Sequence, residues 1–485
     1  MRARPASRRS GGASSTPRRF VGVRQARAGL AALVLAALAA CGPEATSPTV
    51  SPPSALTPAA AATAPTATTV AASPSRTAVE SAPALAATAA PSPVGPALPP
   101  PTVAAPEQPK PPPSASASAT PAPPTALAVP TPRTLPAGLR GYGIQGEFRR
   151  ADAGTLGDLV ANAGLNWVKQ QVPWRDVERA PGKYYWTELD NLVQSMQARG
   201  LSILFSVVKA PDFFKEPALR GSAHGPPADA AHFRTFMRAL VGRYVGRVQA
   251  YEIWNEQNLA REWGAVDDTA YGEFLELLKQ GYLAVKEIDP NAIVVMGALT
   301  PTGVNDPKIA VDDLTYLKRL LALNQGEAGR YFEALGVHPN GGANAPDDTR
   351  LNPAHSKATC NGGWANHDSF FFNRYAQLYQ ALLDAGVTGK TVWMTEFGWA
   401  VTAQPAEGYE YARCNSENDQ AGFITRAFEK VRAETPYVTH LFIWNLNFQQ
   451  IEPATDEKWA FGIVRKDLSG RPAYAAVRAM PKPQP

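Results

Sequence analysis

The sequence predicts an α/β protein built as a (β/α)8 barrel, the TIM barrel, and two observations support this prediction. Short apolar runs alternate with amphipathic stretches from Gly138 onward, and runs without polar alternation are typical of parallel strands buried between helices. The alternation repeats eight times, and the roughly 345 residues available are enough for one closed barrel with long loops. An open doubly wound sheet is disfavoured, because no glycine-rich phosphate-binding turn follows the first strand.

The individual elements are expected from local patterns along the chain. The run 202–208 is rich in β-formers, 187–199 repeats Leu189, Leu192 and Val193 at helical spacing, and Asp289-Pro290 ends a long helix. The same reasoning gives strands at 141–145, 167–172, 202–208, 248–254, 293–297, 334–337, 391–394 and 440–443. The expected helices are 155–163, 187–199, 230–244, 269–288, 313–323, 370–385, 418–433 and 473–478.

Residues 1–40 read as an export signal. An arginine-rich stretch precedes an apolar run at 29–40, which is shorter than the ~20 residues that span a bilayer but suits a signal peptide. The run ends in Leu38-Ala39-Ala40-Cys41 and resembles a bacterial lipobox. We therefore expect a lipid on Cys41 and an exported protein anchored to the cell envelope, facing the periplasm or the outside. An ordinary secretory signal is the alternative.

The net charge excludes one class of partner. The chain carries +5 at pH 7, but eight arginines and no acid precede Cys41. Subtracting those eight charges from +5 leaves −3 for the remainder. A mildly acidic domain does not attract the phosphates of a nucleic acid, so no nucleic-acid partner is expected.

Residues 41–135 form a segment dominated by proline, alanine, serine and threonine. It has few charges and no apolar periodicity, so it buries too little surface to offset the entropy of ordering. We expect a disordered linker at 41–135 and place the barrel domain at 136–485.

The chain has three cysteines, Cys41, Cys360 and Cys414. If Cys41 carries lipid, one pair remains, and paired cysteines in exported proteins tend to be oxidised. We expect a Cys360–Cys414 disulfide, with two unpaired thiols as the alternative. The disulfide would tie the long segment 340–369 to the loop after the seventh strand and shape a cleft there.

Two glutamates lie where strands of the expected barrel end. Glu256 follows Trp254-Asn255 after the fourth strand, and Glu396 lies in Thr395-Glu396-Phe397 after the seventh. Side chains at the C-terminal ends of the strands meet at the barrel mouth. Cleavage of a glycosidic bond needs such a pair, one carboxyl protonating the leaving oxygen and the other, ionised, acting on the sugar.

These motifs resemble those of the clan A glycoside hydrolases, whose acid/base follows an asparagine after the fourth strand and whose nucleophile ends the seventh. The resemblance covers 138–480 and is closer to family 39 than to the family 5 cellulases. The stretch that favours family 39 comprises Trp174-Arg175-Asp176-Val177-Glu178, Pro181-Gly182-Lys183-Tyr184, Trp186 and Leu189-Asp190. The resemblance implies a retaining O-glycoside hydrolase that cleaves an extracellular poly- or oligosaccharide by double displacement.

The resemblance also implies individual roles. Glu256 would be the acid/base, Glu396 the nucleophile, and Asn255 the partner of the sugar 2-hydroxyl. His338 ends the sixth strand and would bind substrate close to the nucleophile, with a structural histidine as the alternative. Trp444 ends the eighth strand and would stack under the sugar, with a core tryptophan as the alternative.

Two further assignments to substrate binding depend on the second strand. Trp174 would either line the cleft or only pack. Lys169 stands where relatives usually carry arginine; lysine keeps the charge but loses the two-pronged geometry of a guanidinium.

No cofactor or metal is expected, since the six histidines lack paired metal-ligand spacing and the P-loop and nucleophile-elbow motifs are absent. The expected partner is a carbohydrate, and the expected state is a monomer. Two non-enzymatic alternatives remain: a carbohydrate-binding surface lipoprotein on the same barrel, and a structural lipoprotein. The presence of both glutamates favours the hydrolase.

Overall fold

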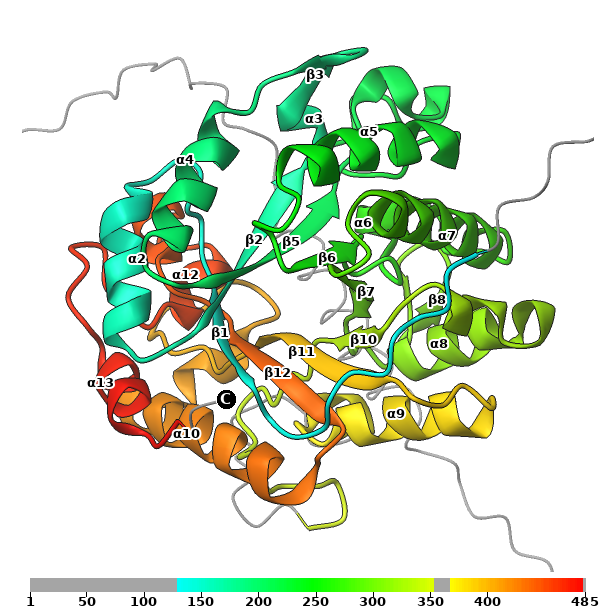
Figure 1. Ribbon diagram of the computed structural model, residues 1–485. Coiled ribbons are helices and arrows are strands. Elements are labelled where there is room, and N and C mark those ends of the chain that lie inside the picture. The colour runs from blue at the N-terminus through cyan, green and yellow to red at the C-terminus, as the bar shows by residue number, and fades with distance from the viewer. Residues whose placement is uncertain (1–128, 353–366, 483–485) are drawn as a thin grey trace, which may run out of the picture. The chain divides into compact units, whose positions relative to one another are not determined.

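The computed structural model describes residues 129–352 and 367–482. Eight parallel strands close into a barrel in the order β1-β12-β11-β10-β7-β6-β5-β2, with helices in a ring outside them (Figure 1). The predicted (β/α)8 barrel is therefore confirmed. The strands are β1 Gly141–Gln145, β2 Trp167–Pro173, β5 Ser202–Val208, β6 Ala250–Ile253, β7 Ile293–Leu299, β10 Ala334–Val337, β11 Thr391–Phe397 and β12 Val438–Ile443.

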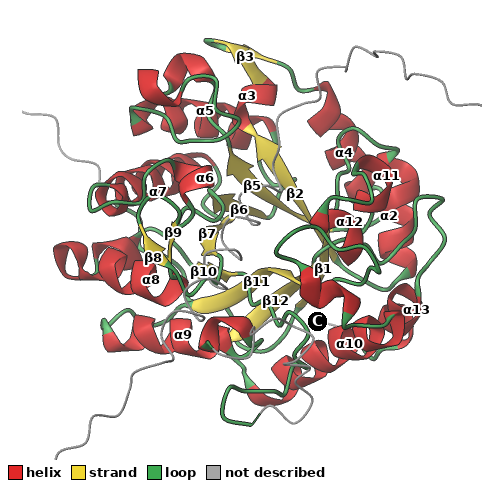
Figure 2. Cartoon of the chain, turned by 180° about the vertical axis from the view of Figure 1, so that it is seen from behind, coloured by secondary structure: helices red, strands yellow, loops and turns green. Residues whose placement is uncertain are grey.

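Helices follow the strands and cover the outside of the barrel, as the view from behind also shows (Figure 2). The larger ones are α2 Ala153–Asn162, α4 Thr187–Gln197, α5 Ala230–Arg243, α7 Ala270–Ile288, α8 Asp313–Ala322, α9 Arg374–Asp384, α10 Glu417–Glu434 and α13 Pro472–Ala479. Short helices and strands lie in the loops at the mouth. They are α3 Trp174–Val177, β3 Glu178–Ala180, β4 Lys183–Tyr184, α6 Ala260–Trp263, β8 Asn305–Asp306, β9 Ala310–Val311, α11 Phe448–Ile451 and α12 Glu457–Phe461.

Several predicted boundaries need correction. β11 continues to Phe397 rather than ending at 394, so Glu396 lies inside the strand. The helix expected from residue 370 begins at Arg374, because Asp368–Phe370 forms a 3-10 turn instead. β6 is shorter than expected, at Ala250–Ile253.

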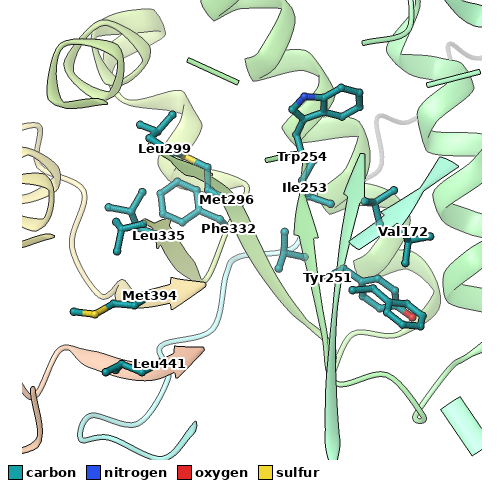
Figure 3. Packing of buried hydrophobic residues seen from close by; sticks show 14 of the residues in the cluster. Val172, Tyr251, Ile253, Trp254, Met296, Leu299, Phe332, Leu335, Met394 and Leu441 are labelled. Atoms are coloured by element: carbon teal, nitrogen blue, oxygen red, sulfur yellow. The ribbon is translucent and has the colours of Figure 1, made fainter. Parts of the chain in front are cut away.

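Two apolar layers explain why the strands read as continuous apolar runs. Outward-facing residues pack against the helices, and Figure 3 shows part of this layer, including Tyr251, Ile253 and Leu335. Inward-facing residues form a second cluster comprising Trp167, Leu204, Ala250, Val295, Ala334, Trp393 and Phe442. Burial of both faces is the property that a parallel sheet covered by helices requires.

The inward-facing cluster also places the polar residues of the barrel. Side chains alternate along a strand, so the residue two positions further on points to the same side. Two positions after Trp167, Ala250 and Trp393 stand Lys169, Glu252 and Thr395, all fully buried. These polar side chains therefore lie above the apolar cluster and below the mouth.

The chain contacts the barrel before the first strand begins. The Tyr282 hydroxyl donates to the Pro130 carbonyl at 2.9 Å, and an Arg133 N–H donates to the Asn291 carbonyl at 2.6 Å. Leu135 packs against the inward-facing cluster. The part of the chain that packs onto the barrel thus begins ahead of the expected boundary at residue 136.

The search for membrane spans covered the described residues. None of the helices found there is both long enough and apolar enough to cross a bilayer.

Candidate active site

Glu256 is held at the barrel mouth by an unusual backbone. β6 ends at Ile253, and Trp254 and Glu256 then adopt φ values of 71° and 51°, in the left-handed region that side chains other than glycine rarely enter. The Trp254 N–H donates to Val207 at 3.1 Å and the Glu256 N–H to Ala298 at 2.8 Å. Bonds to both neighbouring strands therefore fix a strained turn that aims Glu256 over the mouth.

Glu396 faces Glu256 from the opposite wall. The pairing of β11 with β12 shifts register between Met394 and Phe397, and bulges of this kind re-aim side chains beside active sites. One carboxylate oxygen of each glutamate lies within 4.8 Å of the other. Each carboxylate side chain is 13% exposed, so both remain reachable.

A cleft of about 670 Å³ opens above the two glutamates. This volume suits a small ligand or a few sugar rings. The predicted residues Asn255, His338 and Trp444 line the cleft with them. The half-buried Trp444 indole stands edge-on to Phe448 at 4.9 Å. An aromatic ring lining the cleft suits the apolar face of a pyranose.

Lys169 lies beneath the glutamates and does not reach the cleft. Its side chain is 0% exposed, and its ammonium contacts Glu252 Oε2 at 3.0 Å, Glu396 Oε1 at 3.1 Å and Asn255 Oδ1 at 3.5 Å. Burial lowers the pKa of Lys169, but the two carboxylates outweigh burial and the net pKa is raised. Assigning Lys169 to substrate binding is therefore wrong; it anchors Glu396 and Asn255 from below.

His338 bridges the two walls of the site. Its Nδ1 lies 3.0 Å from Glu256 Oε1 and 3.8 Å from Glu396 Oε2, and its Nε2 lies 3.1 Å from Thr395 Oγ1. The prediction placed it near the nucleophile. Its nearer carboxylate partner is instead the other glutamate, Glu256.

The protein groups around Glu256 favour its ionised form. Burial raises the pKa of Glu256, but the His338 hydrogen bond and charge, together with Arg261, lower it to about 2. The Arg261 Nη2 lies 3.2 Å from Glu256 Oε2. Protonated Glu256 therefore requires a change in these contacts.

Trp174 packs and does not line the cleft. Its side chain is fully buried, its Nε1–H donates to Glu178 Oε2 at 2.6 Å, and its ring stacks on Phe214 and Phe236. The other Glu178 oxygen accepts from the Gly182 N–H at 2.7 Å. Assigning Trp174 to substrate binding is therefore wrong, and this motif closes the hairpin β3–β4 instead.

Sequence reasoning missed several residues of the site. Arg261 on α6, Tyr409 and Glu457 on α12 line the cleft, and Glu252 and Thr395 support it from below. A glutamate inside an apolar strand was a usable signal for Glu252, because such a charge needs a partner. Nothing in the sequence around Arg261 pointed to its contact with Glu256.

The predicted disulfide falls partly outside the described residues. Cys360 lies outside them, and Cys414 follows the 3-10 turn Glu410–Arg413. The Cys360–Cys414 pairing therefore stays a prediction.

Glu256, His338 and Glu396 lie close enough together to resemble a metal-ligand set. Lys169, Arg261 and His338 already place positive or donor groups against the two carboxylates. Protein groups therefore already neutralise or hydrogen-bond the two carboxylates of this set.

Comparisons with known proteins give limited likeness. No family model matches. Endo-1,4-beta-xylanase 3 of Hypocrea jecorina is 24% identical over 136 residues, which are 28% of this chain and 38% of the xylanase. A solved family 39 glycoside hydrolase from Bacteroides cellulosilyticus WH2 has a TM-score of 0.51 and 20% identity, covering 70% of this chain and 64% of that one.

A solved glucosidase from Croceicoccus marinus has a TM-score of 0.47 and 16% identity, covering 72% of this chain and 68% of that one. This chain spans less than two thirds of the length of either the xylanase or the family 39 protein. The likeness to the family 39 structure agrees with the barrel fold.

Proposed function

We propose that this protein is a retaining O-glycoside hydrolase acting on an extracellular poly- or oligosaccharide. The observation that carries the proposal is the short distance between two cleft carboxylates, with oxygens of Glu256 and Glu396 within 4.8 Å. Retaining glycosidases hold their carboxyl groups about 5–5.5 Å apart, whereas inverting ones leave about 6.5–9.5 Å for a water molecule. The spacing favours direct attack by a carboxylate.

The contacts support a different role for each glutamate in this proposal. Lys169 holds Glu396 Oε1, which leaves Oε2 to attack the anomeric carbon and form a covalent glycosyl-enzyme. Glu256 protonates the departing oxygen in this first step. In the second step Glu256, now ionised, takes a proton from the water that attacks the anomeric carbon and releases Glu396.

The test is reducing-sugar release by the full chain across a polysaccharide panel. Xylan comes first, because the curated relative is named a xylanase. We expect Glu396→Gln to lower the rate by at least about 1000-fold, because it removes the nucleophile. Glu287→Gln, on the outer face of α7 and paired with Arg238, is the matched control and should behave as wild type.

A non-catalytic carbohydrate-binding protein on the same barrel is the second candidate. The half-buried Trp444 at the cleft favours it as much as it favours an enzyme. Binding to a polysaccharide that is unaffected by Glu396→Gln, with no sugar released by wild type, would select this candidate.

We also propose that the chain is exported and anchored by a lipid on Cys41, a residue outside the described part. The support is the lipobox-like stretch Leu38-Ala39-Ala40-Cys41. Wild type expressed in a bacterium should enter the detergent phase on partitioning, and Cys41→Ser should move to the aqueous phase. Equal partitioning of the two proteins would contradict the anchor.

A further inference from the structure

Both oxygens of the proposed acid are already engaged. His338 Nδ1 lies 3.0 Å from Glu256 Oε1, and Arg261 Nη2 lies 3.2 Å from Oε2. A carboxyl that protonates a leaving oxygen must first carry a proton itself. With His338 and Arg261 in these positions, the proton that Glu256 donates must reach it from a neighbouring group.

The buried hydrogen bonds determine that one ring nitrogen of His338, Nε2, carries a hydrogen. Glu252 is ion-paired with Lys169 at 3.0 Å, so it only accepts hydrogen bonds, and its Oε1 lies 2.8 Å from Thr395 Oγ1. The single hydroxyl hydrogen of Thr395 is thus used on Glu252. Thr395 Oγ1 must accept at its 3.1 Å contact with His338 Nε2, so Nε2 carries a hydrogen whatever the charge of the ring.

The remaining ring nitrogen then determines the charge of the pair. With Nε2 protonated, a proton between His338 Nδ1 and Glu256 Oε1 makes either an imidazolium beside a carboxylate or a neutral imidazole beside a carboxylic acid. The two forms differ by one transfer: the Nδ1–H bond breaks, an O–H bond forms, and both groups become neutral.

We infer that Glu256 and His338 share a single proton and that Arg261 decides which of them holds it. With Arg261 against Oε2, the carboxylate form of Glu256 is stabilised and the proton stays on His338. When Arg261 withdraws, the proton moves to Glu256 and produces the neutral acid that the first chemical step needs. The relevance to catalysis rests on the proposed function, whereas the proton sharing itself does not.

Arg261 is the member of this group that is placed to move. His338 is 5% exposed and bonded through both ring nitrogens. Arg261 sits on the four-residue helix α6, its side chain is 17% exposed, and its Nε already lies 3.5 Å from Glu262 Oε1. Glu262 is fixed by His224 at 2.6 Å, so Arg261 can leave Glu256 and keep an anionic partner.

Other charged groups face the pair from the surrounding elements. Glu396 on β11, Lys169 on β2 and Glu252 on β6 form the ion-paired group below. Burial raises the pKa of Tyr409 well above 10, and burial with Asp456 raises that of Glu457 to about 8, so both are neutral near pH 7. Arg261 is therefore the charged group beside Glu256 whose position changes whether Glu256 or His338 holds the shared proton.

The direct test follows His338 in the ligand-free full chain by ¹⁵N NMR of the histidine rings, assigned by the signal lost in His338→Gln. In wild type, the His338 ring should carry hydrogen on both nitrogens, as expected when Arg261 holds Glu256 in its carboxylate form. Arg261→Gln should shift His338 toward the neutral ring with hydrogen on Nε2. Arg238→Gln, on the outer face of α5, is the matched control and should match wild type. An unchanged His338 signal in Arg261→Gln would overturn the inference.

A second variant gives the opposite sign and guards against a folding defect. Glu262→Gln removes the alternative partner of Arg261, so Arg261 should stay beside Glu256. Glu256 should then stay ionised, and a larger fraction of His338 should be charged than in wild type. In turnover, Arg261→Gln should move the basic limb of kcat/KM up by about one pH unit, the effect of a nearby charge, and Glu262→Gln should move it down. Movement of both in one direction would contradict the inference.

Failure of the two proposals is distinguishable. If no glycan in the panel is cleaved while the His338 signals respond as expected, the hydrolase proposal fails and the proton sharing stands. If hydrolysis occurs but both variants leave His338 and the basic limb unchanged, the proton sharing fails and the hydrolase stands.

Discussion

Lys169 shows how one buried residue supports the whole site. An ammonium has three hydrogens to donate, and three oxygens surround this one: Glu252 Oε2, Glu396 Oε1 and Asn255 Oδ1. The three hydrogens of a lysine ammonium therefore match the three oxygens here, whereas a planar guanidinium would need acceptors in a different arrangement. The departure from arginine thus matches the acceptors that this barrel offers.

We predict that Lys169→Met destabilises the fold strongly. The variant leaves Glu252 buried without its counter-ion, and breaking a buried pair in this way costs about 3–5 kcal/mol. Urea unfolding measures the loss. Lys169→Met combined with Glu252→Gln should recover most of the stability but little activity, since Glu396 still lacks its anchor. A single variant as stable as wild type would contradict the role of this pair.

Glu457 gives a stability prediction with a defined pH window. Burial, reinforced by Asp456, raises the pKa of Glu457 to about 8, above its usual 4.5. The native state thus binds a proton that the unfolded chain releases above pH 4.5, so the stabilising effect is full below pH 4.5 and is lost as pH rises to about 8. Glu457→Gln is neutral at every pH. Its melting temperature relative to wild type should therefore be higher at pH 8.5 than at pH 4.5; an equal difference at both would show that Glu457 titrates normally.

Among the helices, α10 offers the clearest local signal. Ser416 caps its N-terminus: its hydroxyl oxygen accepts from the Asp419 N–H, and the Asp419 carboxylate accepts from the Ser416 N–H. This reciprocal capping box satisfies two backbone donors that a helix start leaves open.

We predict that Ser416→Ala lowers the free energy of unfolding by about 1 kcal/mol, the usual effect of losing such a cap. Chemical denaturation measures it, and kcat should not change because Ser416 lies outside the cleft. Thr425→Ala, on the same helix, is the matched control and should change stability by less than about 0.5 kcal/mol. Equal effects from the two variants would argue against the cap.

The elements that the sequence predicted well are those with strong local patterns. Buried runs such as Ser202–Val208 and Ala334–Val337 were predicted to the residue, because apolar strands are marked by their own composition. The short pieces at the mouth were missed. β9 depends on β8 and on a bridge between Leu259 and Ala310, contacts that local sequence does not encode.

The residues of the site also fall into those that the sequence predicted and those that it missed. Glu256, Glu396, Asn255, His338 and Trp444 follow strand ends, and topology alone brings them to one mouth. Trp174 was misassigned because an aromatic residue after a strand has the same signature whether it faces the cleft or the helices. Arg261 was missed because its role depends on a side-chain contact across a loop.

At the scale of the whole molecule, the barrel separates stability from chemistry. Apolar layers inside and outside the strands stabilise the barrel. The charged side chains of Lys169 and Glu252 lie between the inner apolar cluster and the cleft. Lys169 and Glu252, a buried ion pair, contribute to both stability and chemistry, because they lie where the packed interior meets the two cleft carboxylates.

The most direct test of the central claim is the anomeric configuration of the first product. Proton NMR would follow the hydrolysis of the best substrate from the panel, before mutarotation equalises the anomers. The close approach of Glu256 and Glu396, within 4.8 Å, predicts that the product keeps the configuration of the substrate. Release of the opposite anomer would contradict the double displacement, because it would require a water molecule where the structure places Glu396.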